Sequence, residues 1–169
     1  MAKETFERSL NNGPHHFLAQ FAGNWQGVTR TYFEPGILAD ESEWRGTIRP
    51  ILNGMFMLHE YTGSITGKPL SGTAFYGYNI ASGMFEACWT DSFHNGTAMM
   101  LSRGSVDTAV FSVLGSYPAP DNSPAWGWRT VIRLLRPDSL SIQMFNITPE
   151  GSEALAVDTD YSRASSPQT

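Results

Sequence analysis

The sequence predicts an all-β protein: a single antiparallel up-and-down β-barrel of about ten strands, preceded by a short N-terminal helix. Three observations point to this fold class. From Trp25 onward, apolar residues tend to recur at every second position, which is the period of a β-strand. Short turn signals separate segments of similar length, as in successive hairpins. The 16 glycines and 10 prolines suit many short elements rather than a few long helices.

The helix is predicted just before the first strand. Pro14 has a backbone angle that suits the first turn of a helix. Phe17, Leu18 and Phe21 then recur at helical spacing, and Gly23 suits a helix end. One or two turns fit in this segment. Their apolar face needs a partner, and we expect it to cover one opening of the barrel.

The strands follow at regular spacing, joined by turn residues such as Asn53-Gly54 and Asn95-Gly96. Two longer connections are expected, at 34–41 and 117–125. The candidate strands are 24–33, 42–52, 55–65, 69–79, 84–92, 97–104, 108–116, 127–136, 139–148 and 153–162.

The chain is expected to form one domain. Its 169 residues are enough for one hydrophobic core, and neither a repeat nor a linker divides them. We expect a flexible N-terminus over 1–12, the barrel over 13–163, and a flexible tail over 164–169.

Composition and charge exclude several classes of function. Charged residues make up 16%, the net charge is −5, and Lys and Arg form no run, so nucleic-acid binding is not expected. No stretch approaches the roughly 20 apolar residues that span a bilayer, so no membrane partner is expected either. The first residues lack an apolar leader, and the lone Cys88 cannot form an internal disulfide. These features predict a cytoplasmic protein.

The opening strand carries a first resemblance. Gly23-Asn24-Trp25 resembles the first strand of lipocalin-like (calycin) barrels. The resemblance implies that Trp25 closes one barrel end and that an Arg near the last strand stacks on it. Arg163 is the candidate, and a cation over an indole is favourable by about 0.5–2 kcal/mol.

A longer match covers roughly residues 15–162 and resembles the uncharacterised family known as domain of unknown function 1579. This resemblance implies a calycin-like barrel and leaves activity open. The matching segments are His16 to Trp25, Gly54-x-Phe56, Tyr61-Thr62-Gly63, Gly72, Gly77-Tyr78-Asn79, Trp89-Thr90-Asp91-Ser92 and Ser102-Arg103-Gly104.

A haem-binding barrel family, the nitrobindins, also begins with a motif like Gly23-Asn24-Trp25-Gln26-Gly27. That family places its iron-binding His near the C-terminus, whereas no His follows His94 here. No haem role is carried over, and no cofactor is expected. No metal site is expected either, since His59-Glu60 lacks a second His at metal-binding spacing.

The central strands allow a prediction of register. A turn at Gly67-Lys68 places Tyr61 near Ala74 and His59 near Tyr76. Because side chains alternate, one face of these strands is much more aromatic, and we assign it to the interior. A one-residue bulge would reverse the two faces. The predicted inward residues are Met55, Met57, His59, Tyr61, Gly72, Ala74, Tyr76, Tyr78, Phe85, Ala87, Trp89 and Asp91.

His59 and Asp91 are polar groups on this inward face, where an unpartnered charge costs several kcal/mol. Three interpretations stay open. The two side chains could be satisfied by Tyr hydroxyls, backbone or water. They could orient a ligand between aromatic walls, with Gly72, Ala74 and Ala87 leaving room. They could also be a general base. The predicted ligand-binding residues are His59, Tyr61, Tyr76, Trp89, Asp91 and Met100, with Met99 as a further flexible lining residue.

The leading functional hypothesis is a barrel that binds a small, partly apolar molecule, hydrophobic or aromatic in kind. The first alternative is an enzyme that uses His59 and Asp91 for acid–base chemistry. The second is a structural barrel that forms a homodimer through exposed aromatics and the outward row Phe56, Leu58 and Phe75.

Overall fold

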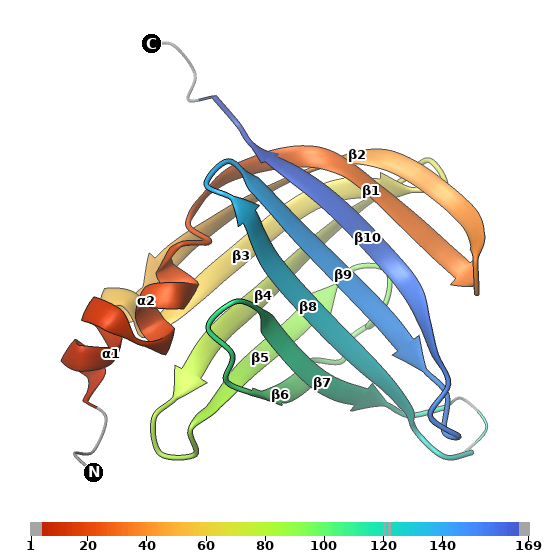
Figure 1. Cartoon of the computed structure of the whole chain (residues 1–169). Helices are drawn as coiled ribbons and strands as arrows, with labels where there is room; N and C mark the ends of the chain where they lie inside the picture. Colours follow the sequence, from red (N-terminus) through yellow and green to blue (C-terminus); the bar gives the residue numbers. More distant parts are fainter. Residues whose placement is uncertain (1–4, 120, 122, 166–169) are drawn as a thin grey trace.

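The structure is a computed structural model that describes residues 5–119, 121 and 123–165. Within these residues, ten strands form a closed antiparallel barrel in the order β1-β10-β9-β8-β7-β6-β5-β4-β3-β2 (Figure 1). The predicted fold class is therefore confirmed. The strands are β1 (Gly23–Glu34), β2 (Ile37–Ile51), β3 (Phe56–Ile65), β4 (Lys68–Asn79), β5 (Met84–Asp91), β6 (Met100–Ser105), β7 (Phe111–Tyr117), β8 (Trp126–Arg136), β9 (Ser139–Ile147) and β10 (Glu153–Arg163), with a 3₁₀ turn, η1, at Leu52–Gly54.

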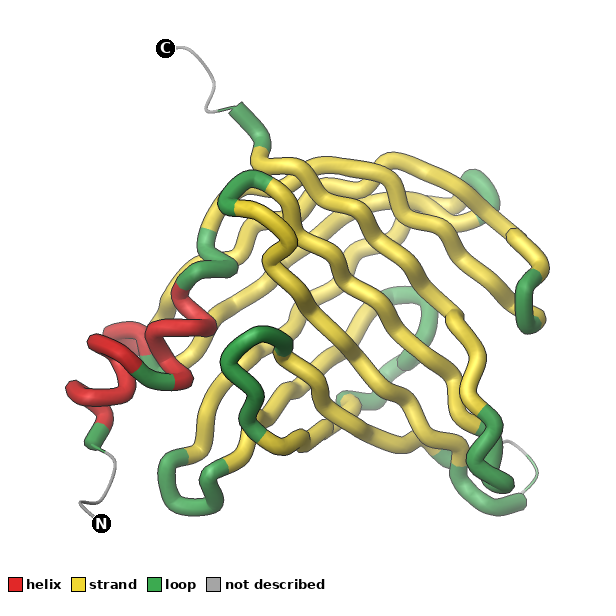
Figure 2. The backbone as a smooth tube through the Cα atoms, viewed as in Figure 1, coloured by secondary structure: helices red, strands yellow, loops and turns green. Residues whose placement is uncertain are grey.

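Two short helices, α1 (Phe6–Asn12) and α2 (Pro14–Ala19), lie together at one end of the barrel (Figure 2). The predicted helix corresponds to α2, which contacts β3 and β4. Leu18 and Phe21 lose almost all their exposure there, at 1% and 0%. Burial of this apolar face stabilises a helix too short to be stable alone.

Helix α1 was not predicted from the sequence. It lies within the segment 1–12, of which residues 1–4 fall outside the described residues. The Thr5 side chain caps its first turn by accepting a hydrogen bond from the Arg8 amide. A ring contact between Phe6 and His15, with centroids 5.0 Å apart, joins α1 to α2.

The first and last strands close the barrel. Trp25 of β1 is opposite Arg163 of β10, and the Arg163 Cζ lies 4.4 Å from the centre of the Trp25 ring. The guanidinium also donates hydrogen bonds to the carbonyl oxygens of Ala22 and Pro137. It therefore joins the end of the helical segment, the β8–β9 turn and the opening strand.

Two sequence expectations about connections are wrong. The loop expected over 34–41 is a tight turn, because Gly36 takes a positive φ of 73° and β2 begins at Ile37. The β3–β4 turn is centred on Thr66-Gly67, with positive φ at both residues (50° and 76°), as in a type I′ hairpin turn.

That one-residue shift of the turn moves the strand pairing by two. Tyr61 is opposite Gly72, and His59 is opposite Ala74. Because two is an even number, the inward and outward faces are unchanged. The assignment of the aromatic face to the interior is confirmed: His59, Tyr76 and Phe85 are exposed by only 3%, 2% and 0%.

The exposure of Met55, Met99 and Phe75 bears on the predicted faces. Met55, predicted to face inward, lies just before β3 and is 44% exposed. Met99 precedes β6 and is 72% exposed, so it does not line the interior. On the outward face Phe75 is 41% exposed, as predicted for that row.

Among the helices of the described residues, none has the length and apolar character needed to cross a bilayer.

Candidate functional site

The end of the barrel opposite the helices is here called the mouth. It is formed by the β1–β2 and β3–β4 turns, by the connections 92–99 and 148–152, and by the described residues between β7 and β8. In Figure 1 the helices lie at the left and the β1–β2 turn at the right. The C-terminal end of β5 brings Trp89 and Asp91 to the mouth, so part of the predicted site lies there.

The segment 92–99 reaches across this mouth. Its Phe93 stacks on Phe33 at the end of β1, with ring centroids 6.0 Å apart and planes 16° apart. Strands β1 and β5 are not neighbours, since β2, β3 and β4 lie between them. The contact therefore spans the opening.

A directed chain of hydrogen bonds ends on Asp91. The Trp89 indole N–H donates to the Tyr61 hydroxyl (2.8 Å), and that hydroxyl donates to Asp91 Oδ2 (3.2 Å). The His94 Nδ1 lies 2.7 Å from the same oxygen. Asp91 Oδ1 accepts from the backbone amides of Phe93 (3.0 Å) and His94 (2.5 Å). The carboxylate thus has partners from both the strand interior and the following turn.

These contacts hold Asp91 in its charged form. Burial acts to raise its pKa, but the hydrogen bonds from the His94 side chain, the charge of His94, and the two backbone amides outweigh burial. The net pKa of Asp91 is lowered. The Tyr61 pKa is raised well above its ordinary value by burial first and then by the Asp91 charge, so Tyr61 stays a neutral donor.

His94 was not predicted as a site residue. Its ring lies among aromatic rings, 5.5 Å from Trp89, 5.7 Å from Trp128 and 4.9 Å from Phe93. Trp89 and Trp128 stack at 5.5 Å and 17°. The sequence signal was the Asp91-x-x-His94 spacing, which lets an Asp accept the amides of the next turn. The sequence prediction places Asp91 on the inward face and a hairpin turn at Asn95-Gly96, and it gives His94 no role.

His59 and Tyr76 form a second pair on the same inner face. The His59 Nδ1 lies 2.9 Å from the Tyr76 hydroxyl. Burial lowers the pKa of His59 to about 3, so the ring is neutral. The ring centroid of His59 is 5.0 Å from that of Tyr61, which links this pair to the Asp91 chain. The structure gives His59 and Asp91 different partners and does not pair them with each other.

Gly72 does not leave empty space as predicted. A Cβ added at Gly72 would lie 2.1 Å from the Tyr61 Cζ, so the Tyr61 ring fills this position. A Cβ at Gly46 would lie 2.7 Å from the His59 Nε2. The glycines admit aromatic rings close to the backbone. Met100, the remaining predicted lining residue, is buried opposite Trp89.

Several buried polar atoms on the inner face have no hydrogen-bond partner among the described residues. These atoms are Thr31 Oγ1, His59 Nε2 and Trp128 Nε1, from β1, β3 and β8. Buried polar groups are nearly always hydrogen-bonded to protein or water, and leaving one unpaired costs about 1–3 kcal/mol. A bound water or a ligand would supply their partners.

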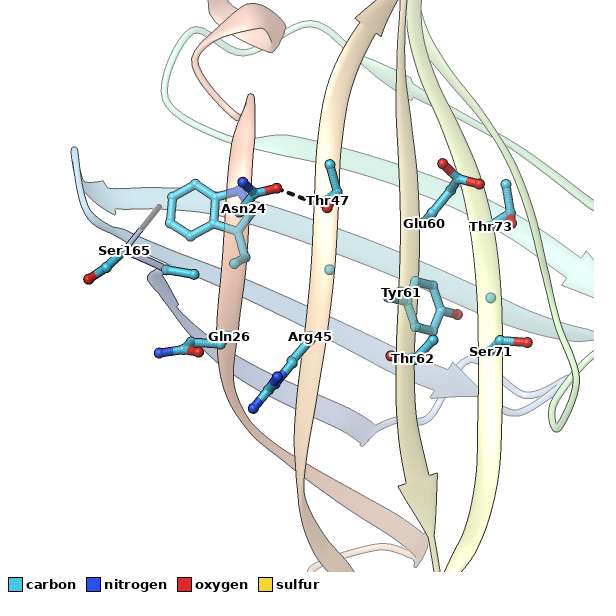
Figure 3. A pocket seen from close by; sticks show the side chains of 14 residues that line it. Asn24, Gln26, Arg45, Thr47, Glu60, Tyr61, Thr62, Ser71, Thr73 and Ser165 are labelled. Atoms are coloured by element: carbon cyan, nitrogen blue, oxygen red, sulfur yellow. Dashed lines mark hydrogen bonds between the residues drawn. The ribbon is translucent and has the colours of Figure 1, made fainter. Parts of the chain in front are cut away.

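Two surface hollows flank this region. One, of about 350 Å³, lies at the mouth and includes Phe33, Trp126, Asn146 and Leu155 in its lining. The larger, of about 700 Å³, lies on the outer face of β1–β4 and is lined by exposed polar side chains (Figure 3). They include Gln26, Arg45, Glu60 and Thr62.

The mouth is the better candidate because its hollow adjoins, through Phe33, the segment that carries His94. Phe33 lines the hollow and stacks on Phe93, which in turn contacts His94. Among the described residues, no group of three or more His, Cys, Asp or Glu side chains could hold a metal ion. The mouth combines aromatic surfaces with the Asp91–His94 carboxylate–imidazole pair.

The fold and the site define a class: closed up-and-down β-barrels with helices at one end and an aromatic, partly polar mouth at the other. The chain belongs to the family described as "Protein of unknown function (DUF1579)", whose model matches residues 11–163. The resemblance inferred from the sequence is thereby confirmed. The comparison with curated proteins gives no match.

Solved structures similar to the chain share its fold. Rv2717c from M. tuberculosis is 17% identical, with a TM-score of 0.59 over 90% of this chain and 98% of that one. The S-type phycobiliprotein lyase CPES from Guillardia theta is 12% identical, with a TM-score of 0.54 over 96% of this chain and 99% of that one. At these identities the likeness concerns the barrel alone.

Proposed function

We propose that the barrel binds a small, partly apolar molecule at its mouth. The observation that carries this proposal is the aromatic cluster around the Asp91–His94 pair. This cluster contains the buried indole N–H of Trp128, which has no partner among the described residues. Ligand pockets combine apolar and aromatic walls with a few placed polar groups. The mouth has this combination.

The size of the mouth hollow supports the same proposal. Its volume of about 350 Å³ falls at the lower end of the range of about 300–1,000 Å³ usual for small-molecule sites. Phe33, Trp126 and Leu155 supply apolar surface, while Asn146 supplies a polar group. Of the residues predicted from the sequence, Trp89, Asp91 and Tyr61 belong to this proposed site. Met100 lies opposite Trp89, and His59 and Tyr76 follow Tyr61 further inside the barrel.

A thermal-shift screen with naphthalene-, indole- and benzene-based compounds tests the proposal, with native mass spectrometry to measure stoichiometry. A compound at 100 times its Kd stabilises the folded state by about 2.7 kcal/mol, which raises the Tm of a chain of this size by several degrees. Trp128→Ala should abolish the shift. The matched control Phe75→Ala, on the outer face, should keep it. A panel without any shift, or equal shifts in both variants, would overturn the proposal.

Self-association is a separate proposal. It is supported by the exposure of Phe56 and Phe75, 39% and 41%, on the outward face of β3 and β4. Light scattering at working concentration tests it, and a monomer would contradict it. A cytoplasmic location and the lack of nucleic-acid or membrane partners stay predictions from composition.

A further inference from the structure

We propose that the mouth recognises a hydroxyl group on an aromatic ligand, as in a phenol or naphthol, through two atoms. His94 Nε2 accepts the hydroxyl hydrogen, and the Trp128 indole N–H donates to the hydroxyl oxygen. This inference rests on the proposed function, since it names the ligand class of the same site.

The direction of the hydrogen bonds fixes which atom of His94 is free. An ionised carboxylate only accepts hydrogen bonds. Asp91 Oδ2 accepts from the Tyr61 hydroxyl, whose own oxygen already accepts from Trp89. The His94 Nδ1 lies 2.7 Å from that same oxygen, so it must carry the hydrogen. With that hydrogen on Nδ1, Nε2 is the ring nitrogen left for a ligand, and in the neutral tautomer it offers a lone pair.

Trp128 supplies the complementary group. An indole N–H is a donor only, and this one is buried and has no partner among the residues described. Trp128 is 6% exposed, and its ring lies 5.7 Å from the His94 ring. No hydrogen bond to His94 Nε2 is found in the described part of the chain. An unused acceptor and an unused donor therefore lie on two rings in contact.

A single hydroxyl group satisfies both. It donates one hydrogen bond and accepts another, whereas an ether or a ketone can only accept and would leave His94 Nε2 unpaired. A carboxylate would bring a second negative charge close to the buried Asp91. The indole faces of Trp89 and Trp128 favour an aromatic body for the molecule that carries the hydroxyl.

Entry of such a ligand requires movement of Phe93. This ring covers His94 at 4.9 Å and is held by its stack on Phe33. Both phenyl rings are partly exposed, 42% and 58%, so the contact can separate without opening the barrel core.

The test compares 2-naphthol with its methyl ether, 2-methoxynaphthalene, by isothermal titration calorimetry on the full chain. Wild-type protein should bind the naphthol about tenfold more tightly. Trp128→Phe keeps a ring but removes the donor, and should weaken naphthol binding several-fold.

Asp91→Asn provides the sharper variant. The Asn oxygen can keep the two backbone amides, and its NH₂ then faces His94 Nδ1. His94 must carry its hydrogen on Nε2 instead, so the preference for naphthol over the ether should be lost while some binding remains. Circular dichroism verifies that each variant is folded. If Asp91→Asn does not fold, the comparison of the two probes with Trp128→Phe still tests the inference.

The outcomes separate the two proposals. Equal affinity of wild type for naphthol and ether would overturn the hydroxyl inference and leave the binding function standing. Naphthol selectivity that survives in both variants would also overturn it. Binding of neither probe, together with a silent thermal-shift panel, would overturn the proposed function itself.

Discussion

His59 is a neutral imidazole that the barrel interior holds against Tyr76. Burial lowers its pKa to about 3, while an unfolded chain exposes a His whose ordinary pKa is 6.5. Between these two values the unfolded state binds one proton more than the folded state. The free energy of unfolding therefore falls as the pH drops through 6.5 towards 3, and this loss is absent at neutral pH.

We expect His59→Gln to flatten this part of the stability profile. A Gln amide can still bond the Tyr76 hydroxyl but takes up no proton. One proton corresponds to a slope of about 1.4 kcal/mol per pH unit. Between pH 4 and 6 the slope of the variant should be smaller than that of wild type by up to this value. Urea unfolding at several pH values measures the slope. Wild type and variant with identical slopes would show that His59 is protonated in the folded barrel.

Asp91 and His94 show how far the positions of single residues could be predicted from the sequence. The alternation of side chains placed Asp91 on the inner face of β5, where it is buried. It could not place His94, because a turn has no period from which a direction follows. The orientation of His94 depends on the Asp91 hydrogen bonds, which only the folded turn at 92–95 creates.

The segment 92–99 is the element that governs access to the mouth. Two hydrogen bonds connect the segment to β5. The Asn95 side chain donates to the Trp89 carbonyl, and the Thr90 hydroxyl donates to the Ala98 carbonyl. Across the opening, ring contact with β1 is made by Phe93 alone among the described residues of the segment. Local contacts therefore shape the segment, and the Phe33–Phe93 stack holds it over the mouth.

A double-mutant cycle measures that stack. Phe33→Ala and Phe93→Ala should be coupled by about 0.5–1 kcal/mol, the usual worth of an aromatic pair at a partly exposed site. Phe93→Ala paired with Phe75→Ala is the matched control and should be additive, because Phe75 lies on the outer face of β4. We also expect Phe93→Ala to speed ligand association. Additivity of the Phe33 and Phe93 substitutions would contradict the covering contact.

The prediction of strands and turns was least accurate at the turns. The strand runs were recognisable from their period, and the observed strands differ from them mostly by a few residues. The β3–β4 turn was misplaced by one residue because Gly67 could serve as the first or second turn residue. The positive φ of Thr66 decides between these, and Thr is an uncommon residue for that conformation.

Closure of the whole barrel depends on the pairing of its first and last strands. The chain ends meet where Arg163 contacts Trp25, Ala22 and Pro137. A Lys cannot reproduce this, since it lacks the planar guanidinium that makes several hydrogen bonds while stacking on an indole. The Gly-x-Trp motif made the contact between Trp25 and Arg163 predictable. The hydrogen bonds from Arg163 to the β8–β9 turn could not be predicted from it.

We expect Arg163→Lys to destabilise the protein by about 1–2 kcal/mol. The control is Arg49→Lys, at an exposed ion pair with Glu60 whose atoms are 3.8 Å apart, which should change stability by less than about 0.5 kcal/mol. Denaturant unfolding gives both values. Equal effects of the two substitutions would show that the closing contact contributes no more than an ordinary surface pair.

The central claim is that a small molecule binds at the mouth, and the tryptophan indole N–H signals test it most directly. Of the chain's 5 tryptophans, Trp25 lies at the helix end, and Trp89 and Trp128 lie at the mouth. In a ¹H–¹⁵N NMR titration with the most stabilising panel compound, the Trp128 and Trp89 indole signals should move furthest. The Trp25 signal, at the helix end, should stay in place. Largest shifts at Trp25, or saturation without any indole shift, would contradict binding at the mouth.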